Sequence, residues 1–368
     1  MKTFNSIIII VSTIFSFLWS CIDGIEVDLW GECYNIVETT YLNLSFSNLS
    51  GEIPQEIGGL INLKGLYLND NQITGPIPES IGNLINLEYL YLRNNQLTGA
   101  LPANLYNLYN LQFLSLSNNQ FEGIISLTIN QLSNLKSIAL DANNITGFIP
   151  ASINNLNQLI YLNLSDNSFV GNLPEGLCSL NNLNQLYLNN NQLSGDIPFC
   201  IDDMSNLEKM YLNDNQFSGP IPASIINLVN LEELYLYNNF LNGFLPSGMS
   251  NLMNLNFLSL YNNELGGEIH PSICSIPGLA HIIIENNQFC PAYPDCIEYV
   301  GYQNTTDCEG ECIVGDLDNN ALINILDVIL LVNQILEYDY NDCSDINSDG
   351  GLNIFDVITI INLIISET

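Results

Sequence analysis

A single motif, L-x-L-x-x-N-x-L-x-G-x-I-P, recurs through the middle of the chain and constrains the fold more than any other feature. Every interval between copies is 24 residues, without an insertion. A period of about 20–50 residues is typical of repeat proteins, in which each unit buries its apolar face only by stacking on its neighbours. The sequence therefore predicts a solenoid of eleven rungs, whose first apolar positions are Leu42, Leu66, Leu90, Leu114, Ile138, Leu162, Leu186, Met210, Leu234, Leu258 and Ile282.

Each column of the repeat has a physical interpretation. Paired apolar residues such as Leu66 and Leu68 alternate inward on a short strand, so the residue between them faces outward. Glycines such as Gly75 and Gly99 permit a tight backbone. The asparagine column falls where the chain turns inside the coil, and a side-chain amide can satisfy both a buried N–H and a buried C=O. We therefore interpret as structural the residues Asn71, Asn95, Asn119, Asn143, Asn167, Asn191, Asn215, Asn239, Asn263 and Asn287.

The stretch "QITGPIPESIGNLINLEYLYL" resembles the plant-type subclass of leucine-rich repeats, and the resemblance covers about residues 38–290. It implies an α/β leucine-rich repeat solenoid in which a curved parallel β-sheet lines one face. It also implies that extracellular proteins or other ligands bind on that face, and that the chain is not an enzyme.

Tyrosines are concentrated at the outward positions of the predicted strands. Two small outward residues, Ser115 and Ala139, separate two aromatic blocks, to which Tyr89, Phe113, Tyr161 and Phe257 also belong. Tyrosine suits a protein partner or a stacked sugar ring, although it is also a common strand residue. These tyrosines do not specify which ligand would bind. The candidate ligand face consists of Tyr67, Tyr91, Tyr187, Tyr211, Tyr235, Tyr237 and Tyr261.

No catalytic residues are predicted. The only histidines are His270 and His281, and no serine or cysteine nucleophile is placed convincingly beside His281. Neither a G-x-G-x-x-G fingerprint nor a P-loop occurs.

The charge balance is strongly acidic. Five Lys and Arg face 39 Asp and Glu, for a net charge of −34, and no basic residue follows Lys209. Nucleic acid and anionic lipid surfaces would repel such a chain, whereas divalent cations would be attracted. Solubility in salty water is an alternative explanation for the acidity.

The N-terminus and the cysteines predict export. Residues 1–20 combine one lysine, an apolar run from Ile7 to Trp19 and a small residue at Ser20, as in a signal peptide, and no later segment could span a membrane. Residues 18–21 loosely resemble a bacterial lipoprotein cleavage box, so a lipid anchor at Cys21 is an alternative to a disulfide there. Ten cysteines in an exported chain favour disulfides. Local pairing would give five, with the pairing open among Cys274, Cys290, Cys296 and Cys308.

Two similar acidic stretches, "GDLDNNALINILDV" and "SDINSDGGLNIFDV", begin at Gly315 and Ser344, and each leads into an apolar segment. Counted from Asp316 and Asp345, oxygen-bearing side chains recur at positions 1, 3, 5, 9 and 12, with a backbone carbonyl at position 7. Ca²⁺ prefers about six to eight oxygen ligands. The sequence predicts two Ca²⁺ ions, one held by Asp316, Asp318, Asn320, Leu322, Asn324 and Asp327, and one by Asp345, Asn347, Asp349, Gly351, Asn353 and Asp356.

A duplicated loop–helix unit with Asp at position 12 resembles a dockerin type I module, here over about residues 313–368. Ala321 replaces the position-6 glycine and Asn320 replaces an acid, so the first site is expected to be the weaker. Dockerins usually read their cohesin partner with small hydroxyl residues at positions 10 and 11. The corresponding candidate docking face in this chain is apolar and consists of Ile325, Leu326, Ile354 and Phe355, so a cohesin-like protein is only one candidate partner.

The predicted organisation comprises a signal peptide (1–20), an N-terminal cap (21–40), a leucine-rich repeat solenoid (41–290), a cysteine-rich cap and linker (291–312) and a dockerin-like, all-α calcium-binding pair of loops and helices (313–368). The predicted function is an exported, non-catalytic binding protein, secreted or at the cell surface. The dockerin resemblance favours a bacterial source. Two alternatives remain: a glycan-binding component of a polysaccharide-degrading complex, and a structural surface or adhesion spacer.

Overall fold

The structure is a computed structural model that describes residues 21–309, 314–317, 323–337, 344–347 and 352–366. The predicted signal peptide lies outside these residues. The chain divides into two compact units, the first ending at Gln216 and the second beginning at Phe217.

The first unit begins with an antiparallel hairpin of β1 (Glu26–Leu29) and β2 (Glu32–Asn35). A disulfide between Cys21 and Cys33 joins the segment before the hairpin to its second strand. Leu29, at the end of β1, is buried. Because the disulfide occupies the sulfur of Cys21, that sulfur is not available for the lipid anchor considered above.

Eleven parallel strands form the first sheet, with adjacent strands offset by 24 residues, so that Leu66 pairs with Leu90. The central residue of nearly every strand is a buried aliphatic side chain, and the flanking residues face outward, as predicted. The strands are β3 (Tyr41–Asn43), β5 (Gly65–Tyr67), β7 (Tyr89–Tyr91), β9 (Phe113–Ser115), β11 (Ser137–Ala139), β13 (Tyr161–Asn163), β15 (Gln185–Tyr187), β17 (Lys209–Tyr211), β19 (Glu233–Tyr235), β21 (Phe257–Ser259) and β23 (His281–Ile283).

A second sheet of eleven parallel strands follows the asparagine turn of each coil. Its glycine column has left-handed backbone, for example φ 73° at Gly75, which glycine adopts at no steric cost. The strands are β4 (Ser50–Gly51), β6 (Gln72–Gly75), β8 (Gln96–Ala100), β10 (Gln120–Ile124), β12 (Asn144–Gly147), β14 (Ser168–Gly171), β16 (Gln192–Gly195), β18 (Gln216–Pro220), β20 (Phe240–Phe244), β22 (Glu264–Glu268) and β24 (Gln288–Cys290).

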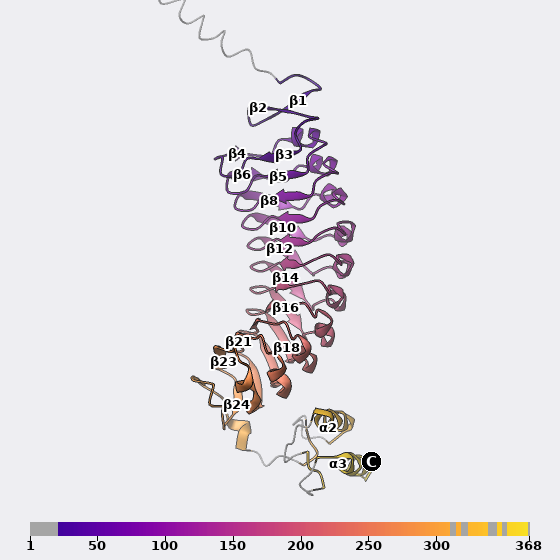
Figure 1. Cartoon of the computed structure of the whole chain (residues 1–368), viewed down its shortest axis with the longest axis vertical. Helices are drawn as coiled ribbons and strands as arrows, with labels where there is room; N and C mark the ends of the chain where they lie inside the picture. Colours follow the sequence, from indigo (N-terminus) through magenta and orange to yellow (C-terminus); the bar gives the residue numbers. More distant parts are fainter. Residues whose placement is uncertain (1–20, 310–313, 318–322, 338–343, 348–351, 367–368) are drawn as a thin grey trace, which may run out of the picture. The chain divides into compact units, whose positions relative to one another are not determined.

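A short 3₁₀-helix closes each full coil (Figure 1). Most begin directly after a proline. The fixed φ of proline suits this position, where extended backbone changes into the helical turn. Where proline is missing, Ser126 and His270 accept a side-chain hydrogen bond from the backbone N–H two residues on. The 3₁₀-helices are η1 (Gln55–Gly59), η2 (Glu79–Asn83), η3 (Ala103–Asn107), η4 (Leu127–Gln131), η5 (Ala151–Asn155), η6 (Glu175–Ser179), η7 (Phe199–Asp203), η8 (Ala223–Asn227), η9 (Ser247–Asn251), η10 (Pro271–Ser275) and, beyond the repeats, η11 (Thr306–Glu309).

The asparagine column forms a ladder of buried hydrogen bonds, which confirms its predicted structural role. The amide of Asn143 donates to the backbone oxygens of Leu116 (3.1 Å) and Leu140 (3.0 Å). Its oxygen accepts from the backbone N–H of Phe121 (3.0 Å). Each asparagine therefore ties its own turn to the preceding coil. Half of the column is buried from water, namely Asn143, Asn215, Asn239, Asn263 and Asn287.

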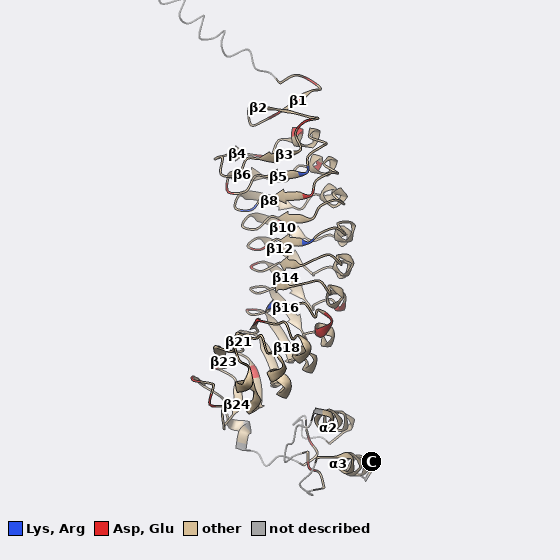
Figure 2. Ribbon diagram, viewed as in Figure 1, with Lys and Arg blue, Asp and Glu red and all other residues tan. Residues whose placement is uncertain are grey.

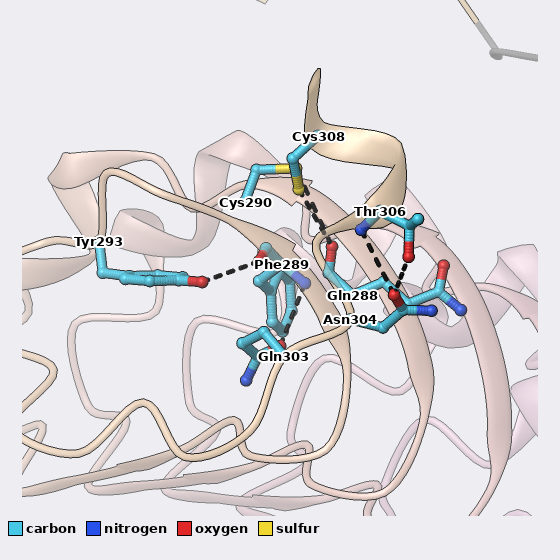
Figure 3. Close-up of a disulfide and its surroundings, with 8 residues drawn as sticks. All are labelled: Gln288, Phe289, Cys290, Tyr293, Gln303, Asn304, Thr306 and Cys308. Carbon is cyan, nitrogen blue, oxygen red and sulfur yellow. Dashed lines mark hydrogen bonds between the residues drawn. A yellow bond between two sulfur atoms is a disulfide. The ribbon is translucent and has the colours of Figure 1, made fainter. Parts of the chain in front are cut away.

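The last coil is closed by Gln303, which takes the place of the asparagine that the next repeat would supply. Its oxygen accepts from the N–H of Phe289 (3.1 Å), and its amide donates to the backbone oxygens of Ile284 and Val300 (both 2.9 Å). Figure 3 shows Gln303 against the buried ring of Phe289, beside the Cys290–Cys308 disulfide.

Four disulfides join cysteines of the described residues, in line with the oxidising environment predicted from the sequence. Cys178 and Cys200 link neighbouring coils. The open pairing among the four later cysteines resolves as an interleaved arrangement, Cys274–Cys296 and Cys290–Cys308. Cys312 and Cys343 lie outside the described residues.

Two α-helices, α2 (Ile325–Glu337) and α3 (Ile354–Ser366), pack against each other near the C-terminus. Their small core comprises Leu317, Val328, Leu331, Ile346, Val357 and Ile360. Within the described part of the chain, neither these helices nor any other is both long and apolar enough to cross a membrane.

Candidate functional site

The predicted ligand face lies along the outward side of the first sheet. Tyr67, Tyr91, Tyr187, Tyr211 and Tyr235 occupy the third position of their strands, and all are half-buried. Tyr237 and Tyr261 lie two residues further on, also half-buried. Stacking between neighbouring coils explains the partial burial.

The first aromatic cluster consists of Tyr67, Tyr89, Tyr91 and Phe113. Parallel register places Tyr67 beside Tyr91 and Tyr89 beside Phe113. Both pairs stack with ring centroids 5.3 Å apart, at interplanar angles of 13° and 5°. Gly65 makes room for this packing, since a Cβ there would lie only 2.7 Å from the ring of Tyr67. The result is an ordered platform of flat apolar surface.

Packing also changes the acidity of the phenols in this cluster. Burial raises the pKa of Tyr67, and the neighbouring phenols and Glu88 raise it further. Burial and then Tyr89 raise the pKa of Tyr91. Both phenols therefore keep their protons to higher pH than a free tyrosine does, and they can donate a hydrogen bond while their rings offer apolar faces.

A second cluster in the first unit consists of Tyr161, Tyr187 and Tyr211. Tyr187 lies 5.6 Å from Tyr161 in a tilted arrangement and 4.8 Å from Tyr211 edge to face. The Tyr187 hydroxyl donates to the side-chain oxygen of Gln185 (3.0 Å). These rings present both edges and faces, unlike the parallel rings of the first cluster.

The second unit carries a third cluster of Tyr235, Tyr237, Phe257, Tyr261 and His281. Tyr237 stacks on Tyr261 at 4.4 Å, and Tyr235 on Phe257 at 6.0 Å. His281 stacks on Phe257 at 4.3 Å, which gives this histidine an aromatic packing role that sequence reasoning missed. The sequence did carry a signal for this packing role, because His281 directly precedes Ile282, the inward position of its strand.

Two of the small residues in the outward column are buried between the strands that flank them. Ser115 is buried, and so is Ser259, which lies in register between Tyr235 and Ile283. Within the described residues the hydroxyl of Ser259 has no hydrogen-bond partner. Ala139 is half-buried.

Sequence reasoning also missed a polar groove of about 420 Å³ in the first unit, which we name the amide groove. It is built from two columns of the repeat, which lie two and four residues before the first apolar position of each copy. The 24-residue spacing of these polar residues was the signal in the sequence that could have revealed the groove. Its lining consists of Lys64, Glu88, Gln112 and Lys136 from one column and Asn86, Asn110, Asn134 and Gln158 from the other.

The first column forms a continuous ladder of side chains across four coils. The Lys64 ammonium lies 3.7 Å from one oxygen of Glu88. The other Glu88 oxygen accepts from the amide of Gln112 (3.3 Å), whose own oxygen accepts from Lys136 (2.9 Å). Each of these residues directly precedes a residue of the first sheet, so the groove borders the first aromatic cluster.

In the predicted calcium loops, the acids at positions 1 and 12 are buried: Asp316 and Asp345 are 3% and 6% exposed, and Asp327 and Asp356 are 0% exposed. Asp327 accepts from the backbone N–H groups of Leu317 and Asn324 (both 2.8 Å), so one carboxylate joins the start of the loop to its end. Asp356 does the same through Asn347 (3.2 Å) and Asn353 (2.9 Å).

The position-9 residues Asn324 and Asn353 accept from the N–H groups of Leu326 and Phe355 (both 2.9 Å), as helix N-caps do. The other predicted ligands, Asp318, Asn320, Leu322, Asp349 and Gly351, lie outside the described residues.

The predicted docking face is exposed on the first turns of the two helices. Leu326 is 54% and Phe355 is 63% exposed, and Ile325 and Ile354 are exposed to a similar degree. Exposed apolar residues continue along both helices, for example Ile329, Leu336 and Ile365. So much apolar surface on two short helices is typical of a surface that binds a partner.

Comparisons with known proteins match the repeats. A family profile described as "Leucine rich repeat" matches residues 37–97, 61–121, 110–169 and 133–193, and a second with the same description matches residues 206–228, 230–252 and 254–276. No curated protein matches the chain.

Several solved structures are similar. The plant peptide hormone receptor RGFR1 in complex with RGF2 is 32% identical over 68% of this chain, with a TM-score of 0.66, but the match spans only 40% of the receptor. A leucine-rich repeat protein of Leptospira interrogans is 32% identical over 65% of this chain and 64% of its own, with a TM-score of 0.51. A plant ice-binding protein is 25% identical over 77% of this chain and 88% of its own, with a TM-score of 0.56.

Proposed function

Because this chain belongs to the leucine-rich repeat proteins, we propose that it is an extracellular recognition protein that binds a ligand on the outward side of its first sheet. The observation that carries the proposal is the ordered aromatic surface of that sheet. Its rings pack against one another from coil to coil, face to face or edge to face, and remain partly exposed. Four disulfides fit an extracellular location.

Pre-stacked rings suit recognition because they lose little conformational freedom when a ligand covers them. Their neutral phenols add hydrogen bonds at the edge of the contact. The similar plant structure is described as a peptide hormone receptor in complex with RGF2, which supports a peptide or protein ligand. Sugars also stack on such rings, and the amide groove beside the first cluster favours this second candidate.

Capture of ligands from native extracellular material tests the proposal. Double variants Tyr67→Ala/Tyr91→Ala and Tyr187→Ala/Tyr211→Ala remove rings from the first and second clusters. Tyr109→Ala is the matched control, because this tyrosine is exposed but lies outside the strands of the first sheet. We expect the double variants to lose the captured ligand and the control to retain it. If all variants capture the same material as the unmodified chain, the sheet is a spacer rather than a binding surface.

We further propose that the C-terminal pair of loops and helices holds two Ca²⁺ ions, the first more weakly. The support is the burial of Asp316, Asp327, Asp345 and Asp356, since buried carboxylates require cations or strong hydrogen bonds and no Lys or Arg follows Lys209. Bound Ca²⁺ would neutralise these acids and fix the loops that position the helices. The carboxylates of Asp327 and Asp356 would align each loop through their backbone hydrogen bonds.

The apolar face formed by Ile325, Leu326, Ile354 and Phe355 would then attach the protein to a partner. A cohesin-like protein of a bacterial polysaccharide-degrading complex fits the dockerin resemblance, although the partner surface would have to be apolar at these positions. A capture experiment run with Ca²⁺ and with EDTA tests the attachment. Binding that is lost in EDTA and lost in Leu326→Glu/Phe355→Glu supports it, and binding that survives both contradicts it.

A further inference from the structure

We propose that the amide groove is the binding site for a carboxylate-bearing oligosaccharide, a chain of uronic acid residues, that runs across the coils from Lys64 to Lys136 beside the first aromatic cluster. This inference rests on the proposed recognition function and names a ligand class and a site for it.

The lining of the groove excludes an apolar ligand. It holds two lysines, one glutamate and five amide side chains, with no apolar side chain. The amides of Asn86 and Asn110 each donate one hydrogen bond to a backbone oxygen, of Ile61 (3.0 Å) and Ile85 (2.8 Å). A second amide proton and the side-chain oxygen of each can therefore pair with a ligand hydroxyl, which also both donates and accepts.

Spacing favours a sugar chain over a peptide. Equivalent residues on adjacent coils recur at about 4.8 Å, which is close to the length of one pyranose residue. An extended peptide advances only about 3.4 Å per residue and falls out of step with the coils. A sugar chain that crosses the strands can therefore repeat the same contacts at Asn86 and Asn110, and its rings can reach Tyr89 and Phe113, which follow Glu88 and Gln112 in sequence.

Charge selects an acidic sugar. Between residues 60 and 165 the chain has three basic and five acidic residues, a net charge of −2, whereas the whole chain has −34. Figure 2 shows Lys and Arg on the coils of the first unit and none on α2 or α3. An anion therefore meets little repulsion along this stretch of an otherwise acidic protein.

Lys136 is the residue that would bind the carboxylate. Its ammonium donates to the neutral oxygen of Gln112 at 2.9 Å, and within the described residues it forms no ion pair with an acid. Lys64 differs, because Glu88 lies 3.7 Å from it. Two ammonium protons of Lys136 thus remain for an anion, and Gln112 holds the ammonium in position.

The test measures binding of a β-1,4-linked oligoglucuronate to the full-length protein by calorimetry, with a neutral cello-oligosaccharide of equal length and an oligoglutamate peptide as comparison ligands. Lys136→Gln removes the charge, and Gln112→Glu keeps the shape of the groove while it pairs Lys136 with a carboxylate. Arg93→Gln is the matched control, since it removes one charge from the same unit at a residue that does not line the groove. Thermal unfolding verifies that each variant is folded.

We expect the oligoglucuronate to bind more tightly than the neutral sugar, and both groove variants to weaken it by about tenfold or more, as for loss of a charge-assisted hydrogen bond. Arg93→Gln should change the affinity by less than about twofold. The inference is overturned if the oligoglucuronate does not bind, if Arg93→Gln weakens it as much as Lys136→Gln, or if the peptide binds more tightly in a manner that requires Lys136. The tyrosine double variants probe different residues, so the proposed recognition function can survive any of these results.

Discussion

The side-chain oxygen of Gln303 accepts a hydrogen bond from the backbone N–H of Phe289, 3.1 Å away, and so replaces the asparagine of a twelfth repeat. In the preceding coils the equivalent backbone N–H donates to the side-chain oxygen of an asparagine 22 residues later in the sequence. The N–H of Leu265, for example, donates to Asn287. A residue from outside the repeat pattern thus supplies the hydrogen-bond acceptor that the last coil would otherwise lack. Stacked repeats need such a cap at each end.

Gln303→Ala is expected to loosen the last coil of the repeats. It leaves the buried N–H of Phe289 and the backbone oxygen of Ile284 without their partners, at a cost of about 2–4 kcal/mol in free energy of unfolding. Hydrogen exchange should show faster exchange at Phe289 than in the unmodified chain. Gln288→Ala is the control, because Gln288 is half-buried like Gln303 but its side chain forms no hydrogen bond within the described residues. Equal protection of Phe289 in both variants would contradict a capping role.

Within the first unit, Asn143→Ala is expected to be more damaging than its neighbour Asn144→Ala. Asn143 is buried and holds two backbone oxygens and the N–H of Phe121, whereas Asn144 is exposed. Removing the amide should lower the free energy of unfolding by about 3 kcal/mol or more, and Asn144→Ala should change it by less than about 0.5 kcal/mol. Denaturant titration checks both values, and similar midpoints for the two variants would be inconsistent with the ladder.

The repeat pattern predicted the alternation of Leu66 and Leu68 along the strand, the asparagine ladder and the solenoid class. These features follow from local geometry that recurs in every coil, and the sequence contains eleven copies of the pattern. Gln303 could not be predicted, because it reaches Phe289 from an irregular segment with no period. The amide groove was missed for another reason: its polar side chains occupy columns outside the motif, and only the register of the strands brings Lys64 and Lys136 onto one ladder.

Alkaline pH is expected to destabilise the first unit. Burial and neighbouring rings raise the pKa of Tyr67 and Tyr91, and burial raises the pKa of Tyr106 and Tyr161. The unfolded chain then loses its phenolic protons at lower pH than the folded chain does. The stability from these groups is fully present below the unfolded pKa of about 10 and is lost as pH rises through the folded values.

Tyrosinate absorbance recorded against pH, for the folded protein and for the protein in denaturant, measures this difference. The folded protein should ionise part of its tyrosines at higher pH than the denatured protein. Tyr67→Phe should remove one of these late steps, because the pKa of Tyr67 is raised by burial and by its neighbours. Identical titration curves for folded and denatured protein would contradict the prediction.

Removal of Ca²⁺ is expected to unfold the C-terminal helices. Asp327 and Asp356 are fully buried, and ten acids lie between Asp316 and Glu367 without a basic residue. Without a cation, their mutual repulsion and desolvation oppose folding, whereas binding stabilises the folded form by RT ln(1 + [Ca²⁺]/Kd). Because α2 and α3 share a core of their own, the fragment 310–368 allows the measurement by circular dichroism. Helix content should rise from EDTA to millimolar Ca²⁺ in two steps, the loop of Asp345 filling first.

Asp327→Ala should abolish the later, weaker step, because it removes both a ligand and the bonds to Leu317 and Asn324. Asn333→Ala, on the exposed side of α2, should leave both steps in place. Helix content that is the same in EDTA and in Ca²⁺ would refute the two-ion proposal. A single step that is unaffected by Asp327→Ala would instead restrict Ca²⁺ to the second loop, because the acid that joins the ends of the first loop would then be serving the backbone alone.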